Sequence, residues 1–281
     1  MLDTTIVVVA IGLVWLFASV SLIVSQINEG ISSLLGSRSK ALGRAIGELV
    51  NDPKVAGWAL QLLNHGLVNP QGSGTAKSLA DLKDMPSYIP PDHFATALLD
   101  GIRGLPGATG ELRDDIARIE DSQLRTLFQG IYAKTQGDVV KIRGELAAWF
   151  GNSMDRASGA YKRRTQVACF CIGLVIAIIF NVDSIHVFKA LWSRPVLMSE
   201  LSAGNPPATA SAAITVLQQL PIGWGDIPSL DWSAAGAFDA ATKAFGWILT
   251  ALSVLFGAPF WFDLLQKIVQ LRSTGPKPKE I

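Results

Sequence analysis

IVVVAIGLVWLFASVSLIV, residues 6–24, is a run of nineteen residues without a charged side chain. A helix rises 1.5 Å per residue, so this run is about 28 Å long, close to the roughly 30 Å hydrocarbon core of a bilayer. A cleaved secretory signal needs basic residues before its apolar run and a small-residue cleavage site after it. Here Met-Leu-Asp-Thr-Thr precedes the run and Ser-Gln-Ile-Asn-Glu follows it. The sequence therefore predicts an uncleaved transmembrane helix within residues 1–27.

Two further apolar runs predict two further transmembrane helices. Residues 167–182 are uncharged, Thr165 and Gln166 extend this second span at its start, and Asp183 marks its far end, which places the span at residues 165–183. Residues 185–192 can continue the helix. Residues 244–262 form a run of nineteen with aromatic side chains near both ends, as expected at two headgroup layers. We place the third span at residues 244–263. Pro259 removes one backbone hydrogen bond from it, which predicts a kink.

The overall composition agrees with an all-α membrane protein. Hydrophobic residues make up 49% of the 281 residues and charged residues 17%, with a mean hydropathy of +0.33. Soluble domains average about 25% charged residues. The 24 Lys and Arg nearly balance the 23 Asp and Glu, so the basic excess of a nucleic-acid-binding protein is missing. We expect the chain to interact with a lipid bilayer and not with nucleic acid.

Basic residues near the span ends predict the orientation. They follow the first span, precede the second and follow the third, and such an excess marks cytoplasmic ends. Residues 28–164 carry seventeen Lys and Arg, whereas residues 184–243 carry three. The N-terminus therefore lies outside, residues 28–164 and the tail 264–281 lie in the cytoplasm, and residues 184–243 form a short extracytoplasmic cap.

The expected cytoplasmic region is helical. Apolar residues at helical spacing predict an amphipathic helix over residues 27–50, which lies either on the membrane surface or against its own soluble part. Asp92 is predicted to cap the N-terminus of a short helix. Thr109 is predicted to cap the N-terminus of a second helix, which continues to Tyr132. Residues 69–91 are rich in proline and glycine and predict a long connection between helices.

A single long helix is predicted from Asp138 into the second span. Apolar positions keep helical spacing there, and no proline interrupts residues 138–182. Three glycines weaken this helix, each by up to about 1 kcal/mol relative to alanine, and a bend is expected near Gly159. In the extracytoplasmic cap, residues 208–219 are the best helix candidate.

Small or weakly polar residues recur at steps of three and four in each span. In lipid such faces let helix backbones approach closely, so they predict a packed bundle or a homo-oligomer seam. A polar pore lining is the alternative, but no charge lies in the middle of a span. The predicted helix-contact residues are Gly173, Ala177, Gly246, Thr250, Ser253 and Gly257.

Polar residues at the span ends are expected to anchor the helices rather than to carry protons or ions. Asp263 precedes Lys267 by four residues, a spacing that predicts an ion pair. Asn181 and Asp183 mark the opposite end of the second span. All four positions are predicted to lie at membrane interfaces, where solvation is ordinary.

Catalytic and metal-binding patterns are missing from the sequence. Cys169 and Cys171 lie about 200° apart on one helix, so they cannot form an ordinary disulfide or share a metal. The three histidines fall on separate segments, and the glycines of residues 72–75 lack the ending of a phosphate loop. The sequence predicts no enzyme, no cofactor and no metal site.

One charged segment is the predicted interaction site. It lies where the long helix approaches the second span, and its residues are Asp155, Arg156, Tyr161, Lys162 and Arg163. Basic residues at this position also fix the membrane topology and contact anionic lipid headgroups, and both roles need only a positive charge. Arg156 and Tyr161 offer more than charge, because guanidinium grips carboxylate or phosphate bidentately and the tyrosine ring carries a hydroxyl.

Two segments resemble an uncharacterised group of bacterial inner-membrane proteins. They are Met-Asp-Arg-Ala-Ser-Gly-Ala-Tyr-Lys-Arg at residues 154–163 and Gly-Ala-Pro-Phe-Trp-Phe-Asp-Leu-Leu at residues 257–265. Residues 181–183, 191–192 and 220–224 are also similar to this group. The resemblance covers roughly residues 149–275 and implies a multi-pass protein of the bacterial cytoplasmic membrane, with no activity or substrate attached.

Three functions remain after these observations. A membrane scaffold that recruits a cytoplasmic protein partner is favoured, because no catalytic pattern is present and the cytoplasmic part is large. An oligomeric channel or small transporter is the alternative, with the small-residue faces lining a pathway. A membrane-embedded enzyme ranks last, because nucleophile, base and metal patterns are all missing.

Overall fold

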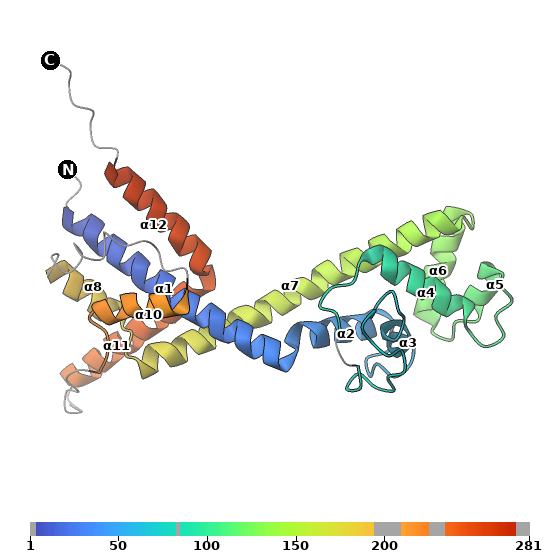
Figure 1. Ribbon diagram of the computed structural model, residues 1–281, viewed down its shortest axis with the longest axis horizontal. Coiled ribbons are helices and arrows are strands. Elements are labelled where there is room, and N and C mark those ends of the chain that lie inside the picture. The colour runs from blue at the N-terminus through green and yellow to red at the C-terminus, as the bar shows by residue number, and fades with distance from the viewer. Residues whose placement is uncertain (1–3, 83–84, 194–208, 225–233, 274–281) are drawn as a thin grey trace, which may run out of the picture. The chain divides into compact units, whose positions relative to one another are not determined.

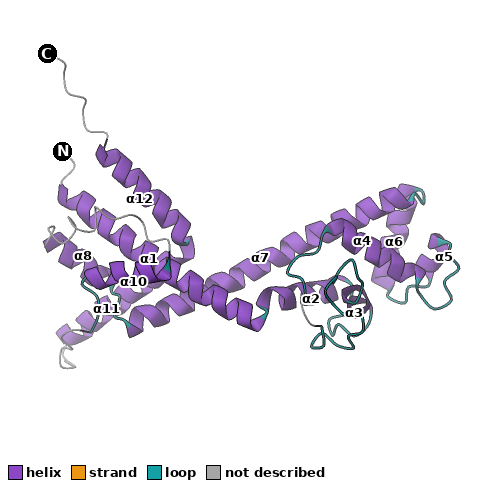
Figure 2. Ribbon diagram, viewed as in Figure 1, coloured by secondary structure: helices purple, strands orange, loops and turns teal. Residues whose placement is uncertain are grey.

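The computed structural model describes residues 4–82, 85–193, 209–224 and 234–273, and every regular element in these ranges is a helix (Figures 1 and 2). The prediction of an all-α chain is confirmed. The chain divides into two compact units, each described by itself. The discontinuous unit comprises Met1–Ile31 and Arg164–Ile281, and the inserted unit comprises Ser32–Arg163.

The inserted unit is built of helices around an apolar core. Its helices are α2 (Ser37–Leu49), α3 (Trp58–Leu63), α4 (Pro91–Arg103), α5 (Leu112–Ala117), α6 (Ser122–Thr135) and the first part of α7 (Val139–Ile179). Phe94 of α4 is fully buried and stacks on Phe150 of α7 with 4.0 Å between ring centroids. Ile46, Leu98 and Leu146 belong to the same core. The core is therefore made by elements distant in sequence.

Local backbone conformations divide two of the predicted helices. Gly36 takes a left-handed conformation (φ 57°) and separates the end of α1 (Thr4–Leu35) from α2. Ile46 of α2 is buried in the core of the inserted unit, so this part of the amphipathic stretch packs against its own unit. The helix predicted after Thr109 is divided into α5 and α6, because the Asp121 carboxylate accepts a hydrogen bond from the N–H of Leu124 and caps α6.

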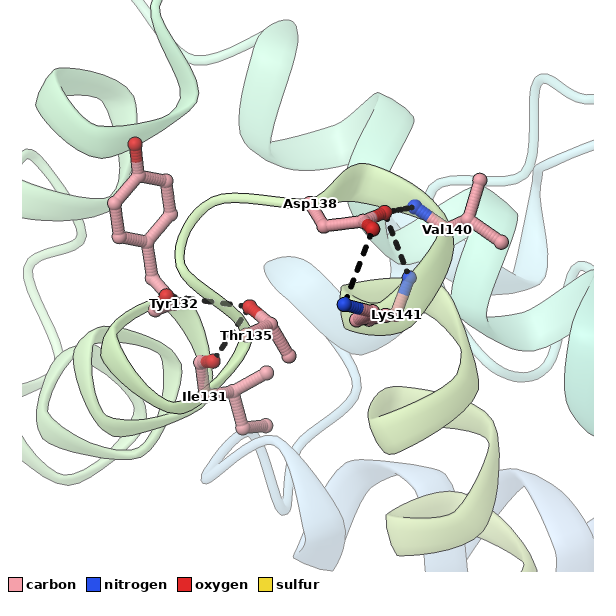
Figure 3. A network of polar contacts seen from close by, with 6 residues as sticks. All are labelled: Ile131, Tyr132, Thr135, Asp138, Val140 and Lys141. Carbon is pink, nitrogen blue, oxygen red and sulfur yellow. Dashed lines mark hydrogen bonds and ion pairs between the residues drawn. The ribbon is translucent and has the colours of Figure 1, made fainter.

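A tight corner joins α6 to α7 (Figure 3). The Thr135 hydroxyl donates to the carbonyls of Ile131 and Tyr132, which closes the end of α6. The Asp138 carboxylate accepts hydrogen bonds from the N–H groups of Val140 and Lys141, at 2.9 and 3.2 Å, and so caps α7. The long helix predicted from Asp138 is confirmed as α7, which is 41 residues long.

The Asp138 cap predicts a pH dependence. The N–H of Lys141 holds the pKa of the Asp138 carboxyl below its ordinary value of about 4. A lowered pKa stabilises the fold above the ordinary value, and this contribution is lost as the pH falls through the lower, folded-state pKa. We expect Asp138→Ala to lower the melting temperature at pH 7 and to flatten its acid dependence below pH 4. Asp138→Asn is the control, because it still caps the helix but cannot titrate; a Tm of Asp138→Ala equal to that of the unmodified chain would contradict the cap.

The discontinuous unit holds the apolar runs. Its helices are most of α1, the last part of α7, α8 (Ser184–Ser193), α10 (Ala210–Gln219), α11 (Ala234–Ser253) and α12 (Ala258–Ser273). Two helices are long and apolar enough to cross a membrane, over Thr5–Leu35 and Gly236–Phe256. A third crossing results if α7 and α8, which are bent by 55°, are taken as one span. The helix expected near residues 208–219 is present as α10.

The structure divides the predicted third span. Residues 244–262 are not one helix: α11 ends at Ser253, a short 3₁₀ turn covers Val254–Phe256, and α12 starts at Ala258. Gly257 between them has φ 79°, a conformation that ends a helix and that glycine adopts without strain. Pro259 falls in the first turn of α12, where a missing N–H costs no hydrogen bond. The expected kink is a complete break.

The helix of the second predicted span is interrupted before residue 183. α7 stops at Ile179 and α8 starts at Ser184. Asn181 has φ 47°, and the N–H of Val182 donates to the carbonyl of Ala177, so the chain leaves the helix here. Residues 194–208 and 225–233 of the expected extracytoplasmic cap, and residues 274–281 of the tail, lie outside the described residues.

Candidate functional site

The small residues predicted to contact other helices fall into two groups. On α7, Gly173 faces the end of α11 and the 3₁₀ turn that follows it: a Cβ at this position would lie 3.1 Å from Val254 Cγ2 and 3.6 Å from Ala251 Cα. Ala177, one turn further along, is fully buried. The two helices therefore approach closely within one chain, as small residues allow.

Gly246 and Thr250 of α11 hold the turn between α7 and α8. A Cβ on Gly246 would overlap the Asp183 carboxylate, so only glycine fits beneath this side chain. The Thr250 hydroxyl donates to the carbonyl of Val182 at 2.9 Å, and the Ser184 hydroxyl donates to the carbonyl of Gly246 at 3.0 Å. These polar groups are therefore hydrogen-bonded to one another within the chain.

Asp183 is a buried cap, with 7% of its surface exposed. Its Oδ1 accepts hydrogen bonds from the N–H groups of Ile185 and His186, which satisfies the first turn of α8. The expectation of ordinary solvation at Asp183 is therefore wrong, because backbone donors replace water. Ser184 was missed from the sequence, since a serine outside the apolar run carries no signal of its partner.

Asn181 joins three segments that are far apart in the sequence. Its amide donates to the carbonyl of Gly223 and accepts from the indole N–H of Trp247. The indole N–H of Trp224 donates to the carbonyl of Ile179, and Lys243 Nζ lies 4.7 Å from the centroid of the Trp224 ring. Residues 181–183 and 220–224, noted above for their resemblance, meet here.

The remaining predicted positions lie in other settings. Ser253 is buried and its hydroxyl donates to the carbonyl of Thr250, whereas Gly257 forms the break before α12 and not a close helix contact. Asp263 and Lys267 are both exposed on α12, and no ion pair joins them in the described structure. Exposed i, i+4 pairs contribute only a few tenths of a kcal/mol, about 0.3–0.5, which does not fix two long side chains.

A groove of about 470 Å³ in the inserted unit contains part of the predicted interaction site. It lies between α2, residues 87–91 and α7, and Asp155 and Tyr161 are in its lining. Arg38 of α2 and Tyr88, which is 70% exposed, also line it, together with Ser87 and Ser158, and the remaining lining is apolar. Arg38 and Tyr88 were missed because nothing in the sequence places them beside α7.

The basic residues of the predicted segment are not in this groove. Arg156 is exposed, and its guanidinium donates to the Ser153 hydroxyl at 3.0 Å. Lys162 and Arg163 are exposed and absent from the groove lining. Within the described residues no ion pair joins Arg38 to Asp155. The groove thus offers one positive and one negative group, both free for an outside partner.

Side chains that could hold a metal ion are scattered over the described residues. Among the described residues, no three His, Cys, Asp or Glu side chains cluster in a way that could hold a metal ion. His65 Nε2 lies 3.4 Å from an oxygen of Asp100, and both side chains are partly exposed. Cys169 and Cys171 are free cysteines.

Comparison of the chain with protein-family models gave no match, and comparisons with curated proteins and with solved structures gave none either.

Proposed function

We propose that this chain is a multi-pass scaffold of the bacterial cytoplasmic membrane, which captures a cytoplasmic protein in the groove of its inserted unit. The proposed membrane location is supported by the apolar surface of the discontinuous unit. Large apolar side chains are exposed along its helices, including Val167, Phe180, Phe245, Phe256 and Phe260. Soluble monomers rarely expose such extensive apolar surface, whereas a bilayer covers it without cost.

The groove supports capture of a protein rather than catalysis. Its lining pairs apolar surface from Leu42 and Met154 with two opposite charges and two tyrosines. Tyrosine and arginine are enriched where proteins bind one another, because they combine contact area with directional hydrogen bonds. We therefore propose a partner segment with an apolar side chain flanked by an acidic and a basic residue, opposite Arg38 and Asp155.

A channel or transporter is less well supported. A pathway through the apolar unit needs polar groups that are free to meet the transported species. The hydroxyls of Thr250, Ser253 and Ser184 are instead bonded to carbonyls of the chain. We also propose that several copies of this scaffold assemble into a homo-oligomer.

Cysteine labelling tests the proposed topology. Ser73 and Ser211 are both exposed and lie in the inserted unit and on α10. In a chain with Cys169 and Cys171 replaced by alanine, we expect a membrane-impermeant maleimide to label Ser211→Cys in intact cells stripped of outer membrane. Ser73→Cys should label only after the membrane is opened. Labelling of both from the same side would contradict three spans with the N-terminus outside.

Photocrosslinking tests the groove. A benzophenone amino acid in place of Tyr88 is expected to give one protein adduct in native membranes. Ala157→Trp, which adds an indole to the groove lining, should reduce the adduct about tenfold, since overpacking a contact commonly costs 1–3 kcal/mol. Ala148→Trp is the matched control, because Ala148 is exposed on α7 outside the groove.

Three results would count against the groove. They are the absence of an adduct, an adduct that persists in Ala157→Trp, and an equal loss in Ala148→Trp. An adduct between two copies of the chain would assign the groove to self-assembly and remove the separate cytoplasmic partner.

A further inference from the structure

The exposed face of α12 combines aromatic rings with two opposite charges. Phe256 is 63% exposed and Phe260 is 44% exposed, and their rings stack with 5.0 Å between centroids. Asp263 and Lys267 are exposed as well. Phe260, Asp263 and Lys267 follow one another at steps of three and four, so they lie on one face of the helix. These three residues and Phe256, which extends the row before α12 begins, form the α12 stripe.

The opposite face of α12 packs inside the discontinuous unit. The Trp261 ring lies 4.9 Å from the ring of Phe17 in α1, and its indole N–H donates to the carbonyl of Ser253 at 2.9 Å. Leu265, one turn further along, is 3% exposed and belongs to the same apolar core as Leu16 of α1. These contacts fix the rotation of α12, so the α12 stripe is turned away from its own unit.

The same contacts place the two charges at the level of the apolar run of α1. Phe17 lies at least seven residues, or about 10 Å along a helix, inside either end of residues 6–24. Asp263 and Lys267 follow Trp261 by two and six residues, or about 3 and 9 Å. Both charges therefore lie between the ends of that run, whichever direction α12 takes along α1.

An exposed charge at this level needs a polar partner. In the hydrocarbon region of a bilayer, ionisable side chains pair with one another or face a water-filled space. Within the described part of the chain, neither Asp263 nor Lys267 has an ion pair or a hydrogen bond. Lipid tails cannot supply a partner. A second copy of the chain supplies both, because it carries the complementary charge for each residue.

We propose that the α12 stripe is a contact between two copies of this chain, in which Asp263 of each protomer pairs with Lys267 of the other. A two-fold symmetric contact forms both ion pairs at once, because each surface meets an identical surface. Phe256 and Phe260 of both protomers pack beside the charges and keep lipid away from them. This inference rests on the proposed membrane location, and it names the surface through which the proposed homo-oligomer assembles.

Charge reversal tests this contact in the full-length protein. Two differently tagged copies are expressed together, and their co-purification through one tag in mild detergent measures pairing. Asp263→Lys gives the stripe two positive charges, and Lys267→Asp gives it two negative charges. Each variant alone should pair with itself about tenfold less or worse, because like charges then face each other. The two variants expressed together should pair with one another, because every positive group again meets a negative one.

An exchanged chain, with Asp263→Lys and Lys267→Asp together, serves if a single variant fails to fold. It keeps the net charge and should pair with itself as the unmodified chain does. It should not pair with the unmodified chain, because aspartate then faces aspartate and lysine faces lysine. An ion pair within one helix would also survive the exchange, but it would not prevent this mixed pairing.

Two matched controls separate the α12 stripe from general effects of charge and ring removal. Arg143→Asp reverses an exposed charge of the inserted unit and should pair with the unmodified chain as well as that chain pairs with itself. Phe245→Ala removes a ring of α11 that is 55% exposed and should leave pairing unchanged. Phe260→Ala should weaken pairing several-fold, because it removes a ring from the contact.

Four results would overturn the contact. They are a monomeric unmodified chain, normal self-pairing of the single variants, no pairing between the two folded single variants, and free pairing of the exchanged chain with the unmodified one. Extraction of membranes with alkaline carbonate tests the membrane location separately. A chain that stays in the membrane but pairs without regard to these charges overturns the contact and leaves the proposed location standing.

Discussion

Gly246→Leu is expected to destabilise the discontinuous unit by about 3 kcal/mol or more. A Cβ at this position overlaps the Asp183 carboxylate, so the side chain must push the turn between α7 and α8 away from α11. Overpacking alone costs about 1–3 kcal/mol. Moving the turn also breaks two hydrogen bonds, from the Thr250 hydroxyl to the Val182 carbonyl and from the Ser184 hydroxyl to the Gly246 carbonyl. Buried polar groups are then left unpaired.

The yield of folded protein in detergent and its melting temperature measure this effect. Gly159→Leu is the matched control, because a Cβ on Gly159 of α7 meets no atom within 4 Å. Glycine is a poor helix former, so the control should keep its stability or gain up to about 1 kcal/mol. Equal stability of the two variants would contradict the close contact between Gly246 and Asp183.

Phe94→Ala is expected to cost the inserted unit about 3–5 kcal/mol, the usual range for removing a buried phenylalanine. The Phe94 ring is fully buried between α4 and α7, where it stacks on Phe150 and lies 6.5 Å from the Trp149 ring. The surrounding helices cannot all move inward to fill the space, so the cavity term adds to the lost apolar burial.

Hydrogen exchange of peptides from α4 and α7 in the full-length protein measures this loss in the inserted unit alone. A whole-chain melting curve reports a loss of stability without saying which unit lost it, whereas hydrogen exchange locates the loss peptide by peptide. Tyr88→Ala is the control, because it also removes an aromatic ring but from an exposed position. Its exchange rates should match the unmodified chain, and slow exchange in Phe94→Ala would show that the ring is not a core residue.

Sequence patterns that extend over at least one helical turn predict the helices of this fold well. The backbone conformations of single residues, which decide where the helices break, cannot be predicted in this way. The helical spacing after Asp138 predicted α7, and the uncharged first run predicted α1. The breaks depend on left-handed residues instead. Gly36 and Gly257 are two of many glycines in the chain, and Asn181 adopts its conformation in contact with Gly223 and Trp247. A tertiary contact of that kind has no local signature.

The candidate site also contains residues that local sequence could predict and residues that only the fold brings together. The segment of Asp155 and Tyr161 could be chosen from its own charges and ring, because those properties are local. The groove also needs Arg38 and Tyr88, which lie more than sixty residues before Asp155 and Tyr161 in the sequence. Arg156 was chosen from the same local properties; it is exposed, and the nearby Ser153 hydroxyl accepts one hydrogen bond from its guanidinium.

The order of the units along the chain has a consequence for biosynthesis. Most of α1 belongs to a unit whose other residues begin at Arg164, so about 130 residues of the inserted unit are translated between them. At about 5–20 residues per second, that delay is roughly 7–26 s. During this time the inserted unit is being synthesised, while Leu16 and Val20 of α1 wait without partners such as Ala177 and Leu191. We expect nascent α1 to depend on lipid or on the insertion machinery for that interval, and ribosome-bound chains stalled before and after residue 164 should differ in cross-linking of Leu16 to that machinery.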